Sequence, residues 1–420
     1  MSLAAAPDSV LTRRPTPGTV AVVAPYGDGG GHLREYSYLG WDCVAVALPD
    51  HERPAAHRDH TVDVPGYSAT VMHTGIRHTV KQLSGIGVDL VVAGSGLGVG
   101  LADRLSYHLG LPGNAVGTTS FRTNRAVQAT ALSDEGIVSA ASMYSTDVMD
   151  ALRWADTARF PSYVVAAADS SVTALPVFCS GPDEIVTTWA WARRAAQHHT
   201  GSGEVMLQQR ISGPQYLIET ISGPLSGDHV VSEIWAETRT EGQAHDRSEL
   251  LHRHGLLFRT LSLYALKVLP VLGIDHGAAR LRVAWNDQLG PVLLSARAFA
   301  QPSSVDAYSP SVGHIAAAAR VATIDGLGRA PESEEHAVMR VSLAVPADGR
   351  ALDAALLRTI STLPTLAYTV RVAESDSSRR KTLHRAASSG ELVLAGTARA
   401  VDEDYRLIRS IEQGGHRGFH

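Results

Sequence analysis

The chain has 420 residues, of which 44% are hydrophobic and 19% charged, with a formal net charge of −5. This length and hydrophobic content allow two or three domains with substantial cores. The mild negative charge gives no overall field for nucleic acid or an anionic membrane, and no run approaches the roughly 20 apolar residues of a membrane span. We therefore expect neither nucleic acid nor a membrane as a partner.

The two cysteines, Cys43 and Cys179, are far apart and have no C-x-x-C spacing. This fits a reducing compartment better than a disulfide framework, so we expect buried free thiols. Residues 1–18 mix prolines with arginines and lack the apolar core of a signal peptide. We predict a flexible N-terminus and a cytoplasmic protein.

Three short apolar runs near the N-terminus predict a parallel sheet. They lie at residues 19–25, 43–48 and 89–93, separated by segments long enough for crossovers, with a helix after the first run. Residues 97–109 carry helical apolar spacing that ends at Gly110. Residues 19–115 are therefore predicted to form a small doubly wound α/β domain.

Two α+β subdomains are predicted next, at residues 116–200 and 201–328. The first has a helix at 123–135, paired strands at 163–168 and 174–178, and a helix at 183–198. The second has an antiparallel group at 204–210, 215–222 and 229–238, a long helix at 249–272 closed by Gly273, a hairpin of strands 278–285 and 291–298, and a helix at 315–325. A small α/β tail follows at 329–420, with a polar boundary at 330–335 and strands near 338–345, 367–373 and 391–395.

Short motifs give weak signals. The alternating glycines Gly94, Gly96, Gly98 and Gly100 do not satisfy G-x-G-x-x-G/A, and there is no G-x-x-x-x-G-K-[ST], so a strand-to-helix turn is expected. No histidine has acidic or cysteine partners at metal-ligand spacing, and no G-x-S-x-G elbow occurs. The motifs alone therefore assign no chemistry.

One long segment resembles a known family. Residues 89–114 (DLVVAGSGLGVGLADRLSYHLGLPGN) resemble the end of the N-terminal domain of ATP-grasp carboxylate–amine ligases of the L-amino-acid ligase type. Later segments keep that family's order: 122–125 (RTNR), 160–161 (FP) before a strand, 208–216 (QQRISGPQY), 273–283 (GIDHGAARLRV) and 290–300 (GPVLLSARAFA). The resemblance implies an ATP-grasp fold, whose ligases clamp ATP between two α+β subdomains and form an acyl phosphate that an amine attacks.

The family's functional positions are substituted here. The resemblance implies two lysines on the phosphates, glutamates along the nucleotide, and two acids with an asparagine on magnesium. The first lysine position is Arg125, the second falls at Val165 or Ala166, and the nucleotide-lining acids match Gln208, Gln209 and Gln215. The two metal glutamates fall on Arg282 and Ser295, the asparagine on Arg297, the next arginine on Phe299, and a further glutamate on Gly96.

Strand periodicity places these substitutions together. Period 2 puts Arg280 and Arg282 on one face of their strand, and Ser295 and Arg297 on one face of its neighbour. Guanidinium groups would then stand where divalent cations sit in the family, and they would repel such ions. We therefore predict these four residues as ligand-binding positions, with no metal, no cofactor and no ordinary Mg-ATP site.

Three interpretations are compatible with this pattern. In the first, the chain is an inactive scaffold, either as a homodimer or as the partner of an active ligase. Alternatively, Arg125, Arg282 and Arg297 bind a small anionic or amino-acid-like ligand directly, without metal. In the third, the chain is an active ATP- and Mg-dependent ligase with metal ligands drawn from other acids, namely Asp275, Asp287, Glu219 or Asp306. By analogy with relatives, a role in bacterial specialised biosynthesis is expected.

Overall fold

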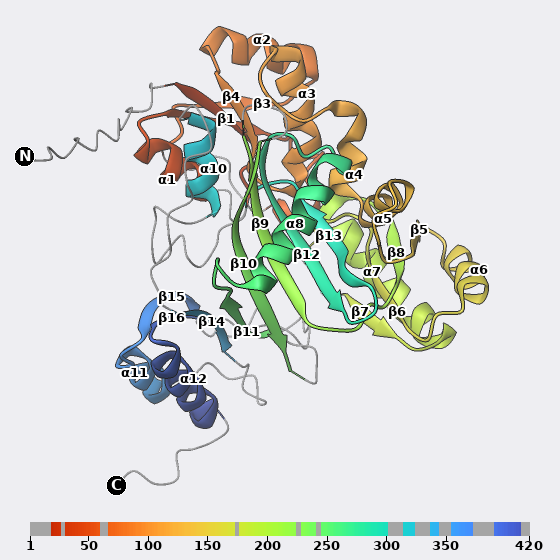
Figure 1. Ribbon diagram of the computed structural model, residues 1–420. Coiled ribbons are helices and arrows are strands. Elements are labelled where there is room, and N and C mark those ends of the chain that lie inside the picture. The colour runs from red at the N-terminus through yellow and green to blue at the C-terminus, as the bar shows by residue number, and fades with distance from the viewer. Residues whose placement is uncertain are drawn as a thin grey trace, which may run out of the picture.

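The computed structural model describes residues 18–26, 30–58, 66–172, 176–223, 228–240, 245–300, 314–323, 337–343, 354–372 and 390–412. Within them the chain forms three sheets with helices on their outer faces (Figure 1). The architecture is mixed α/β, as the sequence predicts. No helix in this part of the chain is both long and apolar enough to cross a bilayer.

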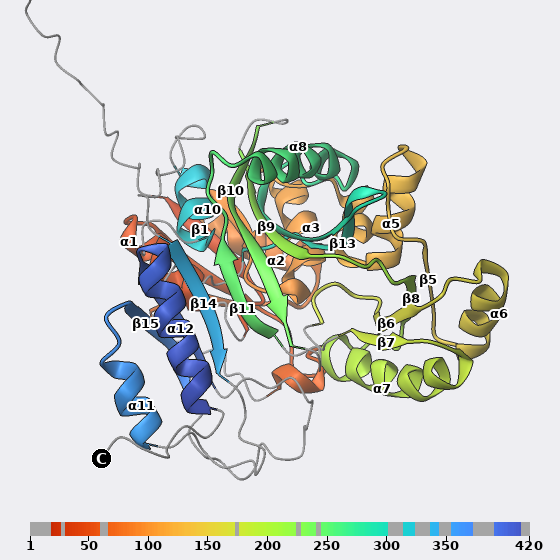
Figure 2. The same cartoon turned by 60° about the horizontal axis from the view of Figure 1, so that its bottom comes forward.

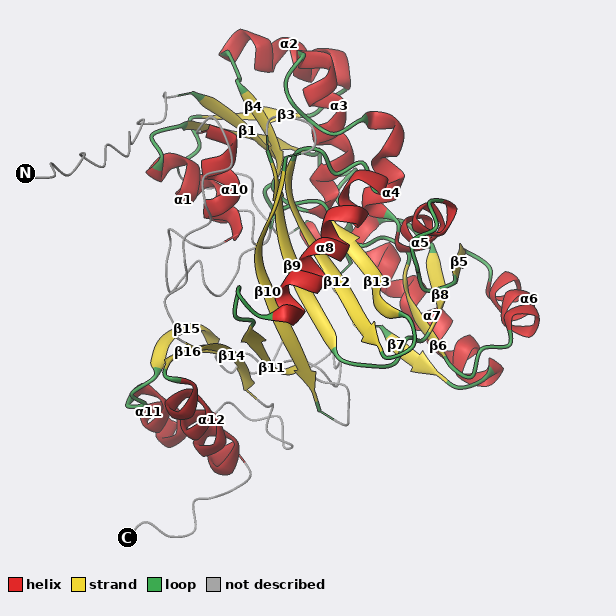
Figure 3. Ribbon diagram, viewed as in Figure 1, coloured by secondary structure: helices red, strands yellow, loops and turns green. Residues whose placement is uncertain are grey.

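The first layer is a parallel sheet of order β3-β2-β1-β4. The central strands β1 and β2 are almost fully buried, because helices cover both faces, whereas the outer strands β3 and β4 are partly exposed. One face packs on α2 and α3, and the other on α1 and on α10, which comes from the C-terminal half of the chain (Figure 3). The elements are β1 (Thr19–Val23), α1 (Gly30–Tyr38), β2 (Asp42–Ala47), η2 (Ala55–His57), β3 (Ala69–Met72), α2 (Ile76–Ile86), β4 (Leu90–Ala93), η3 (Gly96–Gly98) and α3 (Val99–Leu109).

The second layer is a small antiparallel sheet of order β5-β8-β6-β7. Its outer face packs on α6 and α7 through a core that includes Val165, Leu207 and Trp189. Its elements and the segment before it are η4 (Val116–Thr118), α4 (Thr119–Thr123), α5 (Arg125–Asp134), β5 (Ser142–Ser145), α6 (Val148–Ala158), β6 (Tyr163–Ala167), β7 (Val177–Cys179), α7 (Pro182–Thr200) and β8 (Val205–Gln209).

The third layer is a large antiparallel sheet of order β13-β12-β9-β10-β11-β14-β16-β15. Its outer face packs on α8 at one end, and on α11 and α12 at the other. Its elements are β9 (Gln215–Ser222), β10 (His229–Arg239), β11 (His245–Leu250), α8 (Leu256–Val271), β12 (Gly277–Asn286), β13 (Gly290–Arg297), α10 (His314–Thr323), β14 (Ala337–Leu343), α11 (Ala354–Ser361), β15 (Leu366–Val372), β16 (Gly390–Gly396) and α12 (Ala398–Glu412).

Two predictions are wrong. The long helix begins at Leu256, not at 249, because residues 245–250 form β11 and pair with β10 and β14 on either side. β8 does not join β9 and β10 but lies in the small sheet. Instead β8 pairs with β5 and β6. In the turn that follows, Gly213 has φ +124°, and a Cβ there would lie 1.9 Å from the Trp285 carbonyl oxygen, so the backbone passes too close for any side chain.

The remaining predicted elements match within a few residues, including the β12–β13 hairpin. The paired strand at 174–178 is β7, which begins at Val177, and residues 173–175 lie outside the described part. The predicted helix 123–135 is α5, which begins at Arg125 because Asn124 is extended and its side chain caps the helix. The polar boundary at 330–335 also lies outside the described residues. Cys43 and Cys179 are buried free thiols, as expected.

A buried arginine ties the first layer to the large sheet. The Arg122 side chain is fully buried and donates to the Asp103 carboxylate at 2.7 Å, to the Ala115 carbonyl at 2.7 Å and to the Gly273 carbonyl at 2.8 Å. These acceptors come from three segments far apart in the sequence. A single side chain therefore fixes the relative position of α3, the segment before α4 and the turn before β12.

Candidate functional site

The inner faces of the small and large sheets face each other, and we call the region between these two faces the cleft. α7 covers the outer side of the small sheet, and α8 that of the large sheet, so the two uncovered faces lie between them (Figure 2). Strand pairing places Arg280 opposite Arg297 and Arg282 opposite Ser295 on the inner face of β12 and β13. The period-2 prediction for these four residues therefore agrees with the register.

Arg280 is held by a buried carboxylate. It forms a salt bridge with Glu219 of β9, whose side chain is fully buried. The same carboxylate lies 3.6 Å from the Nδ1 atom of His314 and 4.0 Å from the guanidinium of Arg340. Burial by itself raises the pKa of Glu219, but Arg280, together with His314 and Arg340, outweighs it and holds the pKa below its ordinary value. Glu219 is therefore ionised and balances part of the arginine charge.

Arg282 is held by a second carboxylate. Its two terminal nitrogens lie 3.2 and 3.3 Å from the two oxygens of Glu237 on β10, an arrangement that suits the planar guanidinium. Arg239 lies 3.5 Å from the same carboxylate. The Arg282 side chain is 28% exposed, compared with 13% for Arg280. Arg282 is therefore the more accessible of these two guanidiniums in the cleft.

Arg125 and Arg297 bind backbone rather than carboxylates. Arg125, at the start of α5, donates to the carbonyls of Ala167 at 2.5 Å and Val172 at 3.0 Å. Arg297 donates to the carbonyls of Ser170 at 2.6 Å and Val172 at 3.3 Å. The two guanidiniums thus fasten the β6–β7 loop, residues 168–172, to α5 and to the large sheet.

Keeping these two arginines charged is costly. Burial lowers the pKa of Arg125 to about 10. Burial, together with the neighbouring guanidiniums, first that of Arg125, lowers the pKa of Arg297 to about 9. Both residues are still protonated at neutral pH, so the cleft carries a concentrated positive charge.

Gly96 meets the same loop from the first layer. A Cβ built on Gly96 would lie 2.0 Å from the Cβ of Ser171 and 3.1 Å from its Cα, closer than two side chains can approach. Ser171 is itself held, because its hydroxyl donates to the Asp169 carboxylate at 2.6 Å. The position where the family pattern expects a glutamate is therefore filled by the loop.

The three glutamines do not lie together. Gln208 faces inward, on the same side of β8 as Met206, and its Nε2 is buried without a partner among the described residues. Gln209 lies opposite Tyr163, on the side toward α6 and α7. Gln215 begins β9 and pairs with Glu237. Only Gln208 and Gln215 can face a ligand in the cleft.

The candidate positions for the second lysine differ in direction. Val165 points into the helix-covered core, whereas Ala166 lies on the inner face and packs with Ala126. Neither side chain carries charge. Ala166 is thus the position on β6 from which a side chain could enter the cleft.

The acids considered as alternative metal ligands do not converge. Glu219 is engaged by Arg280, Asp287 is exposed in the β12–β13 turn, and the backbone amide of Asp275 is fixed by Asn114. Asp306 lies outside the described residues. In the described ranges no three His, Cys, Asp or Glu side chains form a group that could hold a metal ion.

Sequence reasoning missed several residues that shape the cleft. Glu237, Arg239 and Arg340 come from β10 and β14, which carry no family motif. Trp235 is fully buried on the inner face, with the Arg340 guanidinium 4.0 Å above its ring. The alternation of charged and apolar residues along β10 was the available signal, but it does not specify their partners.

Comparisons with known proteins identify the fold. No family model matches the sequence, and none of the curated proteins matches it either. Among solved structures, the chain is similar to the L-amino acid ligase from Bacillus licheniformis, at 14% identity and a TM-score of 0.72, covering 94% of this chain and 97% of that one. It is also similar to the ADP complex of N5-carboxyaminoimidazole ribonucleotide synthetase, at 12% identity and 0.67, covering 96% and 100%.

A third similar structure is the biotin carboxylase domain of the 2-oxoglutarate carboxylase from Hydrogenobacter thermophilus, solved with MgADP, ADP and bicarbonate. It has 15% identity and a TM-score of 0.60, and the match covers 92% of this chain and 88% of that one. Identities this low establish the fold alone. The chain has an ATP-grasp fold like that of carboxylate–amine ligases, which confirms the resemblance found in its sequence at the level of the fold.

Proposed function

We propose that this ATP-grasp chain is a non-ligating homologue whose cleft binds a small anion directly through arginines, in place of Mg-ATP. The supporting observation is the pairing of Arg280 with Arg297 and of Arg282 with Ser295 on the inner face. Magnesium requires oxygen ligands, chiefly carboxylates, and a guanidinium within a few ångströms of a divalent cation repels it strongly. Guanidinium groups, in contrast, attract the carboxylates and phosphates of a ligand.

The charge of the cleft favours an anionic ligand. The inner faces and the α5 terminus contribute six arginines among the described residues, namely Arg125, Arg239, Arg280, Arg282, Arg297 and Arg340. The described carboxylates on these faces and beside α5 are Asp169, Glu219, Glu233, Glu237 and Glu391, one fewer than the arginines. A positive excess in a low-dielectric cleft raises the local concentration of anions and strengthens their binding.

Two side chains in the cleft have capacity for a ligand. Arg282 is partly exposed, and Gln208 presents a buried amide nitrogen without a partner among the described residues. A buried donor without a partner costs free energy that a ligand acceptor would recover. We therefore expect the anion to contact Arg282 and Gln208, with Gln215 beside them.

A second candidate role is that of an inactive partner. The guanidiniums of Arg125 and Arg297 donate to carbonyls of the β6–β7 loop, and Gly96 packs against Ser171 of the same loop. The loop therefore fills the part of the cleft next to these two arginines. A self-filled cleft suits a scaffold, as a homodimer or paired with an active ligase. An active ATP-dependent ligase with atypical metal ligands is the least supported alternative, because Asp275, Asp287 and Glu219 lie apart. The cytoplasmic location and the biosynthetic context remain predictions.

Calorimetric titration separates these roles. We would titrate the full chain with ATP and ADP, each with and without magnesium, and with metal-free phosphate and carboxylate anions. Metal-free anion binding is expected. Binding of ATP only with magnesium would support the ligase and refute the proposal, whereas binding of none of these ligands would favour the inactive partner.

Charge-reversing variants locate the site. The double change Arg282→Glu with Arg297→Asn should abolish anion binding. The matched control is Arg153→Glu with Arg159→Asn on exposed positions of α6 and its C-terminus, which alters the net charge equally. If anion binding survives the first pair of changes, the anion site lies elsewhere.

A further inference from the structure

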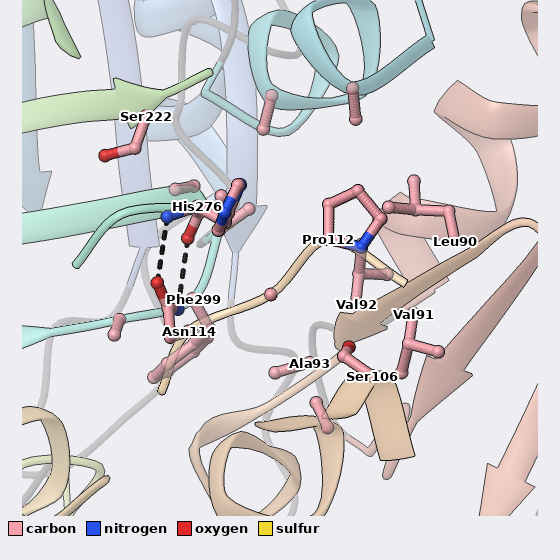
Figure 4. A pocket seen from close by; sticks show the side chains of 18 of the residues that line it. Leu90, Val91, Val92, Ala93, Ser106, Pro112, Asn114, Ser222, His276 and Phe299 are labelled. Atoms are coloured by element: carbon pink, nitrogen blue, oxygen red, sulfur yellow. Dashed lines mark hydrogen bonds between the residues drawn. The ribbon is translucent and has the colours of Figure 1, made fainter. Parts of the chain in front are cut away.

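A cavity separate from the cleft lies where the first layer meets the large sheet. It has a volume of about 160 Å³ and is enclosed by the edge of β4, by α1 and α3, by the start of β12 and by α10 (Figure 4). Asp89 and Trp41 lie on its wall, at the amino ends of β4 and β2. The loop contact of Gly96 lies beyond the opposite end of β4. The cavity therefore extends away from the β6–β7 loop.

The wall of the cavity is mainly apolar, and none of the described residues that line it is an arginine or a lysine. Phe299, Ile315 and Trp41 contribute large apolar surfaces. The carboxylates on the described part of the wall are those of Asp89, which accepts from the Thr19 amide, and Asp103, which is paired with Arg122. The other ionisable side chains there are the histidines His32 and His276. Among the described residues an anion would therefore meet two carboxylates and no arginine or lysine, which favours a neutral molecule.

A hydroxyl on the wall points into this space. Ser106 of α3 lines the cavity, and this residue is 3% exposed. Figure 4 shows it directed into the space between β4 and Pro112. Because a ligand in the cavity would shield this hydroxyl from water, a molecule that accepts or donates one hydrogen bond there should bind better than one that does not.

The edge of β4 supplies further polar groups. β4 is the last strand of its sheet, and the Asp89 amide donates to the Thr19 carbonyl of β1. Successive residues of a strand direct their amides and carbonyls to alternate edges. The N–H and C=O groups of Leu90 and Val92 therefore face away from β1, on the side of the cavity, where a planar donor–acceptor group could pair with them.

The size of the cavity limits the ligand. Sites for drug-sized ligands span roughly 300–1,000 Å³, so a nucleotide does not fit, whereas an apolar cavity of about 150 Å³ accommodates benzene. We propose that this cavity binds a small neutral ring compound that carries an amide-type donor–acceptor pair, with Ser106 and the β4 edge as its hydrogen-bonding partners. The proposal is independent of the arginine cleft, since none of the six arginines lines the cavity.

Three ring compounds test the proposal on the full chain by ligand-detected NMR and calorimetry. 2-Pyridone is neutral and carries adjacent donor and acceptor groups, benzene has no polar group, and benzoate is an anion. We expect saturable binding of 2-pyridone, weaker binding of benzene and none of benzoate. Failure of 2-pyridone to saturate, or stronger binding of benzoate, would overturn the proposal.

Variants of residues that line the cavity test whether 2-pyridone binds there. Ala318→Phe on α10 fills the cavity and should remove 2-pyridone binding. Ser106→Ala keeps the fold and should weaken 2-pyridone about three- to tenfold while leaving benzene unchanged, since it removes one hydrogen bond. The control Ser262→Ala removes a buried hydroxyl of α8, which does not line the cavity, and should change neither. Retention of full 2-pyridone affinity in both Ala318→Phe and Ser106→Ala contradicts the proposed site.

Discussion

Arg280 and Arg297 face each other across the β12–β13 ladder, yet we expect their removal to change stability by different amounts. Arg280 is paired with a buried carboxylate, whereas Arg297 binds only backbone carbonyls. The perturbation is a single change to methionine at either position, which keeps most of the side-chain volume and removes the charge. The two variants are thus matched in chemistry and differ only in what the guanidinium contacts.

For Arg297→Met the two main terms nearly cancel. The variant loses two charged hydrogen bonds, to Ser170 and Val172, worth about 3–6 kcal/mol together. It also removes the cost of a charge whose pKa has fallen from 12.5 to about 9, on the order of 5 kcal/mol. Arg125 still donates to the Val172 carbonyl at 3.0 Å. The unfolding free energy should therefore change by less than about 2 kcal/mol.

For Arg280→Met no such cancellation is available. The variant leaves Glu219 fully buried, with Arg340 at 4.0 Å and His314 at 3.6 Å as its remaining partners. Removing one member of a buried ion pair destabilises by about 3–5 kcal/mol, because the other charge stays buried and undercompensated. This variant should be clearly less stable than the wild-type chain.

Urea denaturation followed by far-UV circular dichroism measures the difference as a shift in midpoint at constant slope. We expect a small shift for Arg297→Met and a large one toward lower urea for Arg280→Met. The reasoning is refuted if the two variants lose equal stability, or if Arg297→Met loses more. Either outcome would mean that the loop contacts, and not the buried carboxylate, dominate the energetics of the cleft.

Three further predictions concern the frame of the cleft. Arg122→Met should destabilise by about 3–5 kcal/mol, because it leaves Asp103 buried without its cation; urea midpoints measure this. Gly96→Ala should destabilise by about 1–3 kcal/mol through the clash with Ser171, and Ser171→Gly in the same chain should restore most of the loss. Burial lowers the pKa of His314, so only the unfolded chain gains its proton near pH 6.5, and stability should fall below that pH by up to about 1.4 kcal/mol per pH unit, less so in His314→Gln.

Controls for these changes come from exposed or open positions. Arg153→Met breaks an exposed pair with Asp150 and should cost less than about 1 kcal/mol, unlike Arg122→Met. Gly85→Ala lies inside α2 with open space around its Cβ and should stabilise by about 0.5–1 kcal/mol, unlike Gly96→Ala. Equal effects within either pair, or a His314→Gln curve that parallels the wild-type curve between pH 7.5 and 5.5, would contradict the reasoning.

Much of the fold follows from local pattern. Apolar, β-branched runs located β1, β2 and β4, and glycine stops located the end of α3. The alternation of residues in β12 and β13 was enough to place Arg280, Arg282, Ser295 and Arg297 on one face, since side chains of a strand alternate with period 2. The order of motifs along the chain indicated the ATP-grasp fold.

Tertiary structure alone decided which groups meet. Glu219, Glu237 and Arg340 pair with the hairpin arginines because β9, β10 and β14 lie in one sheet, and strand order is not encoded in the period of any single strand. β11 forms because partners flank it on both sides, which outweighs a helical local pattern. The β6–β7 loop is fixed by contacts between residues more than 40 positions apart. The sequence therefore determined the helices and strands and which residues share a face of each strand. Long-range packing determined which carboxylate pairs with each arginine and where a cavity is left between the layers, because both depend on strands far apart in the chain.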